Sequence, residues 1–435
     1  MIKAYSRYKP TKLSWLPFIP EDWSVVRGKF LFNLAKRTPL EDDGIVTAFR
    51  DGQVTLRSNR RQDGFTNALK EIGYQRVCKG DLVIHAMDAF AGAVGVSDSD
   101  GKSTPVYSCC IPNSSVNAEF YGYLVRNMAL TGFIASLAKG IRERSTDFRW
   151  VDFSNQYLPF PLILEQELIV RFLNRETARI DSLISEKQNF IKLLKEKRKA
   201  LVSNVVTKGL DPDVEMKDSG VEYIGSIPKS WKLVPLKYLC GFSGGGTPAK
   251  DNLEFWNGDI PWVSPKDMKS FWITSSKDKI TEEAVEKSSA SFVDTGAVLI
   301  VVRSGILRNK IPVAINTMPV TLNQDMKALR FKSENYALYF AHFIEGLYDY
   351  LLPEWRKQGA TVESIEQGFL QKSLIPVPSK SEIEEINNEI GKRSEKITCL
   401  IEETQKSIYL LRERRVALIS AAVTGKIDLR DKEVA

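Results

Sequence analysis

The segment Ile19-Pro20-Glu21-Asp22-Trp23-Ser24-Val25-Val26 has a second copy, Ile227-Pro228-Lys229-Ser230-Trp231-Lys232-Leu233-Val234, at an offset of 208 (227 − 19). A later pair, Leu193-Leu194-Lys195-Glu196-Lys197-Arg198 and Leu410-Leu411-Arg412-Glu413-Arg414-Arg415, has an offset of 217 (410 − 193). Because the matching segments come in the same order, the chain consists of two copies of one unit with diverged interiors. A duplicated frame of this kind suits a molecule that holds two different binding surfaces at a fixed separation.

Length and composition agree with two globular units. The chain has 435 residues, of which 43% are hydrophobic and 26% charged, so each copy is long enough to bury its own core. The sequence contains no apolar run of about 18 residues and no basic-then-apolar amino terminus. We therefore expect no membrane span and no secretory signal, and we predict a cytoplasmic protein.

The cysteine count and the net charge narrow the classes of protein to which this chain could belong. The five cysteines are odd in number and form no CxxC pair, which argues against a disulfide framework or a zinc site and favours free thiols. The net charge of +7 has the sign expected of a protein that binds a polyanion, although it decides nothing alone.

Two long stretches have the apolar spacing of a coiled coil. The first runs from about 164 to 208 and the second from about 381 to 424, with alternating three- and four-residue steps. The predicted seam residues are Ile169, Leu173, Ile180, Leu183, Leu194 and Leu201 in the first, and Ile386, Ile390, Ile397, Leu400, Leu411 and Leu418 in the second. Helices with matching seams are expected to pair.

The length of these helices suggests a rod. A helix of about 44 residues spans roughly 66 Å, more than a domain of this size needs internally. A whole globular unit separates the two helices in sequence, so an antiparallel pair would carry one globular unit at each end. The alternative is that each helix packs only on its own domain.

Each globular unit reads as mixed α/β. Short apolar runs at 81–84 and 296–302 are typical of strands, and 118–137 and 336–352 of helices. Pro159-Phe160-Pro161 and Pro376-Val377-Pro378 are expected to act as stops and hinges before the long helices, since proline has no N–H donor and restricts the preceding residue.

Catalytic motifs are missing from the sequence. The two histidines, His85 and His342, have no spacing typical of a metal pair or an acid–base dyad, and we predict that both are packing residues. The sequence also has no GxxxxGK[ST] loop, no strand–GxGxxG–helix motif and no Asn-Pro-Pro-Tyr or Asp-Pro-Pro-Tyr segment. The glycines of Gly244-Gly245-Gly246-Thr247-Pro248 could form a flexible loop or a loop that approaches a DNA backbone.

Basic residues gather with polar and aromatic ones in both diverged interiors. Arginine and lysine can bind guanine edges or phosphates, and asparagine or glutamine can pair with adenine. The candidate DNA-binding residues are Arg57, Arg60, Arg61, Arg142, Arg144 and Arg149 in the first unit, and Thr247, Lys250, Lys266, Arg303, Arg308, Lys310, Asn323 and Gln324 in the second. Any one cluster could be a solvated face, but recurrence in both units favours DNA binding.

The chain resembles the specificity (S) subunits of Type I restriction-modification systems over nearly its whole length. The resemblance rests on the paired Ile-Pro-x-x-Trp segments, the Gly244–Pro248 loop followed by Asp259-Ile260-Pro261-Trp262-Val263, and the central segment from Leu158 to Leu210. None of these is a catalytic motif, but their order and duplication are specific.

The resemblance implies an α+β fold with a pseudo-twofold repeat: two tandem mixed α/β target recognition domains joined by two conserved long helices that pair as an antiparallel coiled coil. It assigns residues 1–157 and 211–374 to the recognition domains, and 158–210 and 375–435 to the helical spacers. Each domain is expected to read one half of a split, asymmetric DNA target.

The resemblance also implies a division of labour. The chain itself is expected to do no chemistry and to hold no cofactor. Two modification subunits would bring S-adenosylmethionine, and restriction subunits would bring ATP and Mg²⁺. One departure is that Lys380-Ser381-Glu382-Ile383 stands where the first copy has Leu164-Glu165-Gln166-Glu167, which puts the equivalence of the two methylase contacts in question. The rival functions are a self-contained methyltransferase or nuclease, and a coiled-coil adaptor that binds only proteins.

Overall fold

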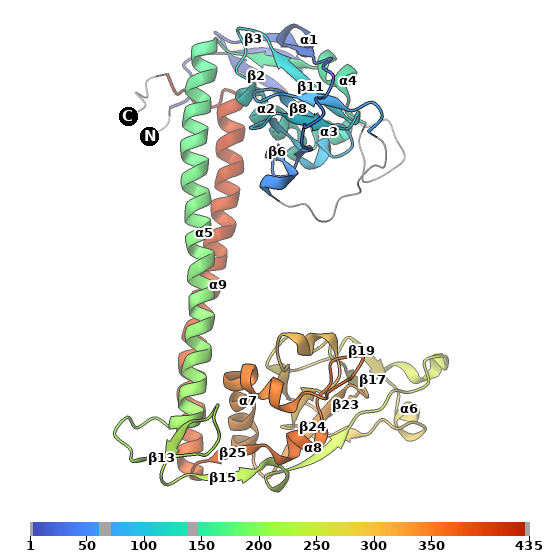
Figure 1. Cartoon of the computed structure of the whole chain (residues 1–435), viewed down its shortest axis with the longest axis vertical. Coiled ribbons are helices and arrows are strands. Elements are labelled where there is room, and N and C mark those ends of the chain that lie inside the picture. The colour runs from blue at the N-terminus through green and yellow to red at the C-terminus, as the bar shows by residue number, and fades with distance from the viewer. Residues whose placement is uncertain (1–2, 61–70, 138–146, 431–435) are drawn as a thin grey trace. The chain divides into compact units, whose positions relative to one another are not determined.

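The computed structural model describes residues 3–60, 71–137 and 147–430 (Figure 1). The chain forms two compact units, one made of Met1–Lys187 with Gln405–Ala435 and the other of Gln188–Thr404. This division cuts through both long helices, whereas the predicted boundaries at 157/158, 210/211 and 374/375 follow the chain; those boundaries stay a prediction.

The first unit is built on an antiparallel sheet in the order β4-β11-β8-β9. Its strands are β4 (Phe32–Leu34), β11 (Tyr107–Pro112), β8 (Leu82–His85) and β9 (Val94–Val96), flanked by the pairs β5 (Val46–Ala48) with β6 (Val54–Leu56) and β7 (Gln75–Val77) with β10 (Gly101–Ser103). Helix α2 (Ala118–Leu130) packs on β8 and β9. Short helices α1 (Gly28–Leu31), α3 (Phe133–Ser136) and α4 (Trp150–Asn155) complete the unit.

The predicted strand and helix of this unit are confirmed with shifted bounds. The strand expected at 81–84 is β8, whose Leu82, Val83 and Ile84 are fully buried. The helix expected at 118–137 divides into α2 and α3 because Gly132 between them has a φ of 83°, a left-handed conformation that ends a helix.

The second unit contains a larger sheet in the order β16-β24-β21-β22-β18 and a second one in the order β19-β17-β23-β20. Their strands are β16 (Cys240–Gly244), β24 (Met326–Phe331), β21 (Val298–Val301), β22 (Val313–Asn316), β18 (Trp272–Ile273), β19 (Asp278–Ile280), β17 (Trp256–Val263), β23 (Val320–Leu322) and β20 (Phe292–Val293). Helix α7 (Glu334–Trp355) packs on β21, β22 and β24, and α6 (Glu282–Glu286) and α8 (Gln367–Lys372) are short.

The two units share their outer frame, as the repeat predicts. Each begins with an antiparallel pair, β1 (Tyr8–Leu13) with β2 (Leu16–Pro20) and β13 (Met216–Asp218) with β14 (Ser226–Pro228). Each then joins its two ends in a ladder, β3 (Ser24–Arg27) with β12 (Tyr157–Phe160) and β15 (Lys232–Pro235) with β25 (Leu374–Val377). The repeated Trp23 and Trp231 are both 0% exposed.

The repeated proline segments belong to these ladders. Pro159 and Pro376 lie within β12 and β25, so the segments are strands rather than free hinges. The hydroxyl of Tyr121 donates to the carbonyl oxygen of Pro159 at 3.1 Å, and that of Tyr339 donates to the carbonyl oxygen of Pro376 at 2.9 Å. The same bond therefore anchors the central helix of each unit to its closing strand.

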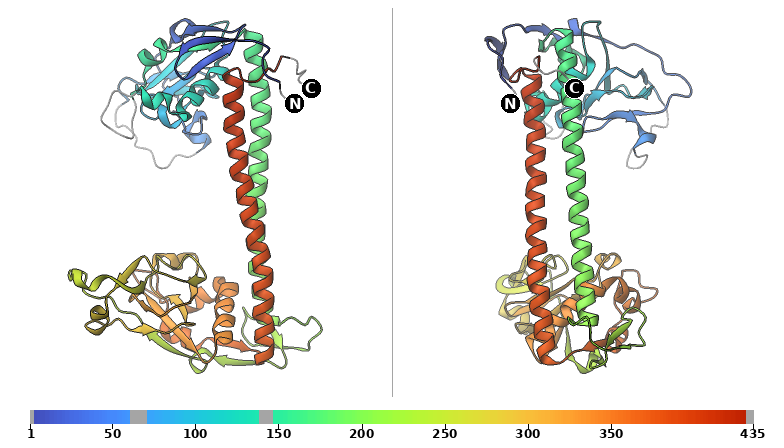
Figure 2. Two further views of the ribbon diagram at one scale, coloured as in Figure 1. Left: turned by 180° about the vertical axis from the view of Figure 1, so that it is seen from behind. Right: turned by 90° about the vertical axis from the view of Figure 1, so that its left-hand side faces the viewer.

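The long helices are α5 (Ile163–Lys208) and α9 (Lys380–Val423), close to the predicted ranges. In the first unit, Ile169 and Leu173 of α5 share a core with Ile419 and Val423 of α9. In the second unit, Val202 and Val205 of α5 share a core with Ile383 and Ile386 of α9. Within each unit the views of Figures 1 and 2 agree that the two helices lie side by side. The early part of α5 meets the late part of α9 and the converse, so the helices pair antiparallel, and the alternative of separate packing is wrong.

The predicted seam residues differ in burial. Seven of its residues are buried, namely Ile169, Leu173, Ile180, Leu194, Ile386, Ile390 and Ile397. Leu183, Leu201, Leu411 and Leu418 are half-buried. Leu400 is 43% exposed, and the assignment of the seam stays a prediction. From Ile397, a step of four residues leads to the half-buried Ile401 and a further step of three to the buried Thr404, which is the heptad spacing.

Candidate nucleic-acid interface

The second unit contains a recess of about 580 Å³ formed by segments far apart in the sequence. It is lined by Thr247, Lys250, Leu253, Trp256, Trp262, Ser264, Pro265, Lys266, Asp278, Ser304, Asn323, Gln324 and Asp325. Five of the eight candidate residues of this unit lie here: Thr247, Lys250, Lys266, Asn323 and Gln324. The loop after β16, both ends of β17 and the turn between β23 and β24 bring them together.

Glycines in the loop after β16 allow the chain to pass close to the protein's own backbone. A Cβ at Gly245 would lie 2.0 Å from the carbonyl oxygen of Asn323, and one at Gly246 would lie 2.3 Å from Oγ of Ser289. The N–H of Gly246 donates to the carbonyl oxygen of Leu322 at 2.8 Å. These two glycines therefore serve internal packing, and the loop presents Thr247 rather than an open backbone cradle.

The polar contacts show which side chains of the recess are bonded within the protein and which can still bind a ligand. Asn323 is only 6% exposed, and its Oδ1 accepts the N–H of Asp325 at 3.1 Å, so it shapes the turn. The hydroxyl of Thr247 donates to Oε1 of the exposed Gln324. The indole N–H of Trp262 donates to the carbonyl oxygen of Gly246 at 2.9 Å. Gln324 keeps its amide NH₂ group at the surface.

The recess contains charges of both signs, with two lysines and the carboxylates of Asp278 and Asp325 in its lining. Lys250 and Lys266 are exposed, and among the described residues neither forms an ion pair. Arg303 has its Nε 2.6 Å from Oδ1 of Asp325, so this candidate lies at the rim with its charge partly compensated. The surface combines two ammonium groups without ion pairs, the amide of Gln324 and the half-buried Trp256.

The remaining candidates of the second unit lie outside this lining. Arg308 ends the 3₁₀ turn Gly305–Arg308 and has its Nε 3.9 Å from Oε1 of Glu363. Glu363 also faces Arg356, at 3.2 Å. Lys310 is exposed on the chain that follows the turn.

In the first unit the candidate arginines are more dispersed. Arg57 and Arg60 follow β6, where Nε of Arg57 donates to Oγ1 of Thr47 at 2.9 Å. Arg60 has its Nη2 2.5 Å from Oδ2 of Asp51 and its guanidinium 4.2 Å above the ring centroid of Phe49. Arg149 precedes α4 with its Nε 2.6 Å from Oδ1 of Asp147. Arg61, Arg142 and Arg144 lie outside the described residues.

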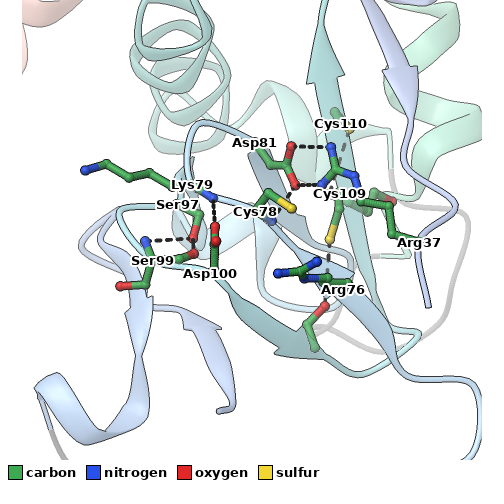
Figure 3. A network of polar contacts seen from close by, with 12 residues as sticks. Arg37, Arg76, Cys78, Lys79, Asp81, Ser97, Ser99, Asp100, Cys109 and Cys110 are labelled. Carbon is green, nitrogen blue, oxygen red and sulfur yellow. Dashed lines mark hydrogen bonds and ion pairs between the residues drawn. The ribbon is translucent and has the colours of Figure 1, made fainter. Parts of the chain in front are cut away.

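Sequence reasoning missed a polar network in the first unit (Figure 3). Arg37 forms two hydrogen bonds with the carboxylate of Asp81, at 2.5 and 3.1 Å, and Asp81 also accepts the N–H of Cys78 at 2.8 Å. The hydrogen bond to Asp81 raises the pKa of Arg37 despite its partial burial. No local sequence pattern indicates this pairing, which joins residues 44 apart in the chain.

Each histidine packs against an aromatic ring and lies near one carboxylate, Asp88 for His85 and Glu345 for His342. His85 meets the ring of Tyr107 edge-on at 4.5 Å, and burial lowers its pKa. His342 is 6% exposed and stacks on Phe271 at 5.2 Å. Both contacts fit the predicted packing role.

Among residues 3–60, 71–137 and 147–430, no cluster of three or more His, Cys, Asp or Glu side chains could hold a metal ion. Within the same ranges, no helix is long and apolar enough to span a bilayer.

Comparison with known proteins identifies relatives of the chain. The family model for the Type I restriction modification DNA specificity domain matches residues 228–433. The Type I restriction enzyme EcoR124I/EcoR124II specificity subunit of Escherichia coli is 33% identical over 335 residues, 74% of each chain. The MjaIX specificity subunit of Methanocaldococcus jannaschii is 32% identical over 168 residues, 38% of each chain.

Solved structures show the same fold at low sequence identity. A chain from work on complex assembly and conformational transition of the type I R-M system has a TM-score of 0.72 at 17% identity, covering 94% of this chain and 99% of that one. The HsdS subunit from Thermoanaerobacter tengcongensis has a TM-score of 0.53 at 16% identity, covering 94% and 98%. From the sequence relatives and the shared fold together, the chain belongs to the specificity subunits of Type I restriction-modification systems, where it supplies DNA specificity and not catalysis.

Proposed function

We propose that each unit reads one half of a bipartite, asymmetric DNA target, and that α5 and α9 set the distance between the halves. The observation that carries the proposal is the recess of the second unit, where five candidate residues converge on one concave surface. An amide such as that of Gln324 can pair with an adenine edge, and lysines can hold phosphates or guanine.

The first unit would read the other half-site with different side chains. Its arginines beyond β6, Arg57 and Arg60, and Arg149 before α4 are the described candidates. No residue pattern links these positions to the recess of the second unit. This difference inside a common frame agrees with two half-sites of unrelated sequence.

The target specificity can be tested by exchange. Residues 19–157 are replaced by the same region of a relative, and methylated adenines are mapped by single-molecule sequencing in cells that carry the complete system. We expect one half-site to change and the other to stay. A change in both half-sites would contradict independent reading.

The helices offer a second test. Their 46 and 44 residues correspond to about 69 and 66 Å at 1.5 Å per residue, longer than the 34–36 Å between half-sites one helical turn apart. Removing one heptad from each helix should shorten the nonspecific gap and leave both half-site sequences unchanged. An unchanged gap would argue against the helices as a ruler.

The partners of the complex would dock on surfaces of the frame. Leu193 and Leu410 occupy equivalent positions in the repeat and are 61% and 56% exposed. Exposed leucines at matching positions suit two copies of one partner, which we propose are the two modification subunits, with S-adenosylmethionine. The restriction subunits would bring ATP and Mg²⁺, in the cytoplasm.

The first copy also exposes an apolar residue that the second lacks. Leu164 at the start of α5 is 71% exposed, whereas Ser381, which corresponds to it at the offset of 217 that also relates Leu193 to Leu410, is polar. Leu164→Ser should therefore weaken binding of one modification subunit more than the other. Equal weakening, or none, would mean that the two contacts do not differ here.

Two rivals make different predictions. A self-contained methyltransferase or nuclease would bind S-adenosylmethionine or cut DNA as the isolated chain. A coiled-coil adaptor would give no salt-sensitive DNA binding even in the assembled complex. We expect neither behaviour.

A further inference from the structure

A second recess, of about 400 Å³, lies in the first unit where α2 and β9 meet the paired helices. Its lining includes Lys79 before β8, Glu119 and Arg126 of α2, Asn174 of α5 and Arg415 of α9. None of these residues belongs to the candidate DNA-binding set. We call it the Arg126 recess.

The fold makes room for the guanidinium of Arg126. Gly52 and Gly92, with φ of 93° and 89°, border it, and a Cβ at Gly52 would lie only 2.7 Å from Nη1 of Arg126. Within the described residues, Nε of Arg126 is a buried donor with no acceptor. Burial, together with the nearby charge of Arg415, lowers the pKa of Arg126. A buried cation in this position is costly unless an anion joins it.

Three carboxylates near Arg126 accept hydrogen bonds from other residues. Asp51 accepts hydrogen bonds from Arg60 at 2.9 Å, and Asp181 accepts from Arg415 at 3.0 and 3.2 Å. Glu119 accepts from Asn174 at 2.8 Å. The exposed ammonium group of Lys79, which extends away from the Arg37–Asp81 pair in Figure 3, has no ion pair in the described chain either. Asp98 also lines the recess, so its lining holds as many carboxylates as cations, and the donor left without an acceptor among the described residues is the buried Nε of Arg126.

The repeat supplies an internal comparison. Arg198 of the first sequence copy is equivalent to Arg415 of the second, at the offset of 217 (415 − 198). In the second unit, Nη2 of Arg198 donates to Oε1 of Glu345 on α7, at 2.8 Å, so the central helix supplies the anion. In the first unit the central helix brings Arg126 instead, and a recess stands beside it.

We propose that the Arg126 recess binds a phosphate group from outside the chain, held by Arg126 with Lys79 and Arg415 nearby. A planar guanidinium with free donors matches phosphate oxygens, and charge-assisted bonds of this kind are strong in a partly buried site. The phosphate comes either from the DNA backbone, in which case the inference rests on the proposed function, or from a free phosphate compound.

The test uses full-length protein and inorganic phosphate, with binding measured by calorimetry against chloride at constant ionic strength. Arg126→Gln should weaken phosphate binding about tenfold or more, as loss of a charge-assisted bond does. The matched control is Arg7→Gln, since Arg7 is an exposed arginine of the same unit, 3.8 Å from Glu21. Lys79→Gln alters only an exposed side chain and should weaken phosphate binding several-fold, so it keeps the test valid if the Arg126 variant folds poorly.

Salt titration of DNA binding by the assembled complex separates the two sources. If the phosphate is that of DNA, Arg126→Gln lowers the salt slope by about 0.9, and inorganic phosphate competes. If it is free, phosphate binding depends on Arg126 while the salt slope does not. Absence of any Arg126 effect in both measurements overturns the inference, while unchanged half-sites after domain exchange would overturn the proposed function alone.

Discussion

Arg415 of α9 donates from Nε to Oδ1 of Asp181 on α5 at 3.0 Å and from Nη2 to Oδ2 at 3.2 Å. This two-point bond joins the paired helices inside the first unit. Its counterpart in the repeat, Arg198, bonds instead to Glu345 of the neighbouring α7. Equivalent arginines of the repeat therefore have different partners: Arg415 bonds the two long helices to each other, and Arg198 bonds a long helix to the central helix of the second unit.

The Arg415–Asp181 bond should contribute modestly to stability. Its side chains are 25% and 53% exposed, so a double-mutant cycle of Arg415→Gln and Asp181→Asn should give a coupling of about 0.5–1 kcal/mol. Urea unfolding at low and high salt measures it. A coupling that does not fall in high salt would contradict an ion pair at the surface.

The stability of the second unit should depend on Glu345 in acid. Burial works to raise the pKa of Glu345, but the nearby His342 and Arg198 together hold it below the ordinary value of 4.5. A lowered carboxyl pKa stabilises the fold above about pH 4.5 and loses that contribution as the pH falls through the folded pKa. Wild-type protein should therefore lose more stability than Glu345→Gln between about pH 5 and pH 3, by urea unfolding. Parallel pH curves would exclude the effect.

The difference in burial between two nearby residues of α9 predicts that their substitution lowers the free energy of unfolding by different amounts. Ile397 is 8% exposed and Leu400 is 43% exposed. Ile397→Ala should lower the free energy of unfolding by about 2–4 kcal/mol, while Leu400→Ala should change it by about 0.5 kcal/mol or less. Thermal or urea unfolding checks both, with each variant as the other's control. Equal losses would place Leu400 in the seam.

Two recess residues should affect DNA binding in different ways. Gln324→Ala should relax base preference at one position of one half-site, by about 1–3 kcal/mol. Lys266→Gln should instead weaken all sequences alike and lower the salt slope by about 0.9. Lys232→Gln, an exposed lysine of β15, is the control. The affinity of the assembled complex is measured for a panel of DNA targets that differ in a single base pair. If Gln324→Ala weakens binding to all of them equally, Gln324 does not read a base.

The cysteines should differ in reactivity. Cys399 is exposed, whereas Cys109 is buried and burial raises its pKa to about 12. Since the thiolate is the reactive form, alkylation near pH 8 should label Cys399 quickly and Cys109 only in denaturant. Mass spectrometry of the modified peptides checks the order. Early labelling of Cys109 would mean that its strand opens readily.

The ranges of the two long helices could be predicted closely from the sequence. Heptad spacing is local, so Ile180 and Ile397 could be assigned from steps along one helix. Leu400 and Ile401 are adjacent apolar residues, and the sequence does not show which of the two faces the partner helix. Burial resolves the choice, with Leu400 exposed and Ile401 half-buried.

The surfaces could be predicted only in part. Thr247, Lys250, Lys266 and Gln324 were candidates by residue type, but their meeting in one recess depends on pairing β17 with β23 across a sequence gap. Arg126 was not a candidate, because nothing in the residues around it shows that Asp51 and Asp181 are bonded elsewhere.

The sequence alone predicts the duplication, the two long helices and the family, because repeats and heptad periodicity are patterns among residues close together in the chain. Tertiary structure decided which charges are neutralised and which remain free. That depends on contacts between residues distant in the chain, such as Arg198 with Glu345 and Arg415 with Asp181, which no local sequence pattern specifies.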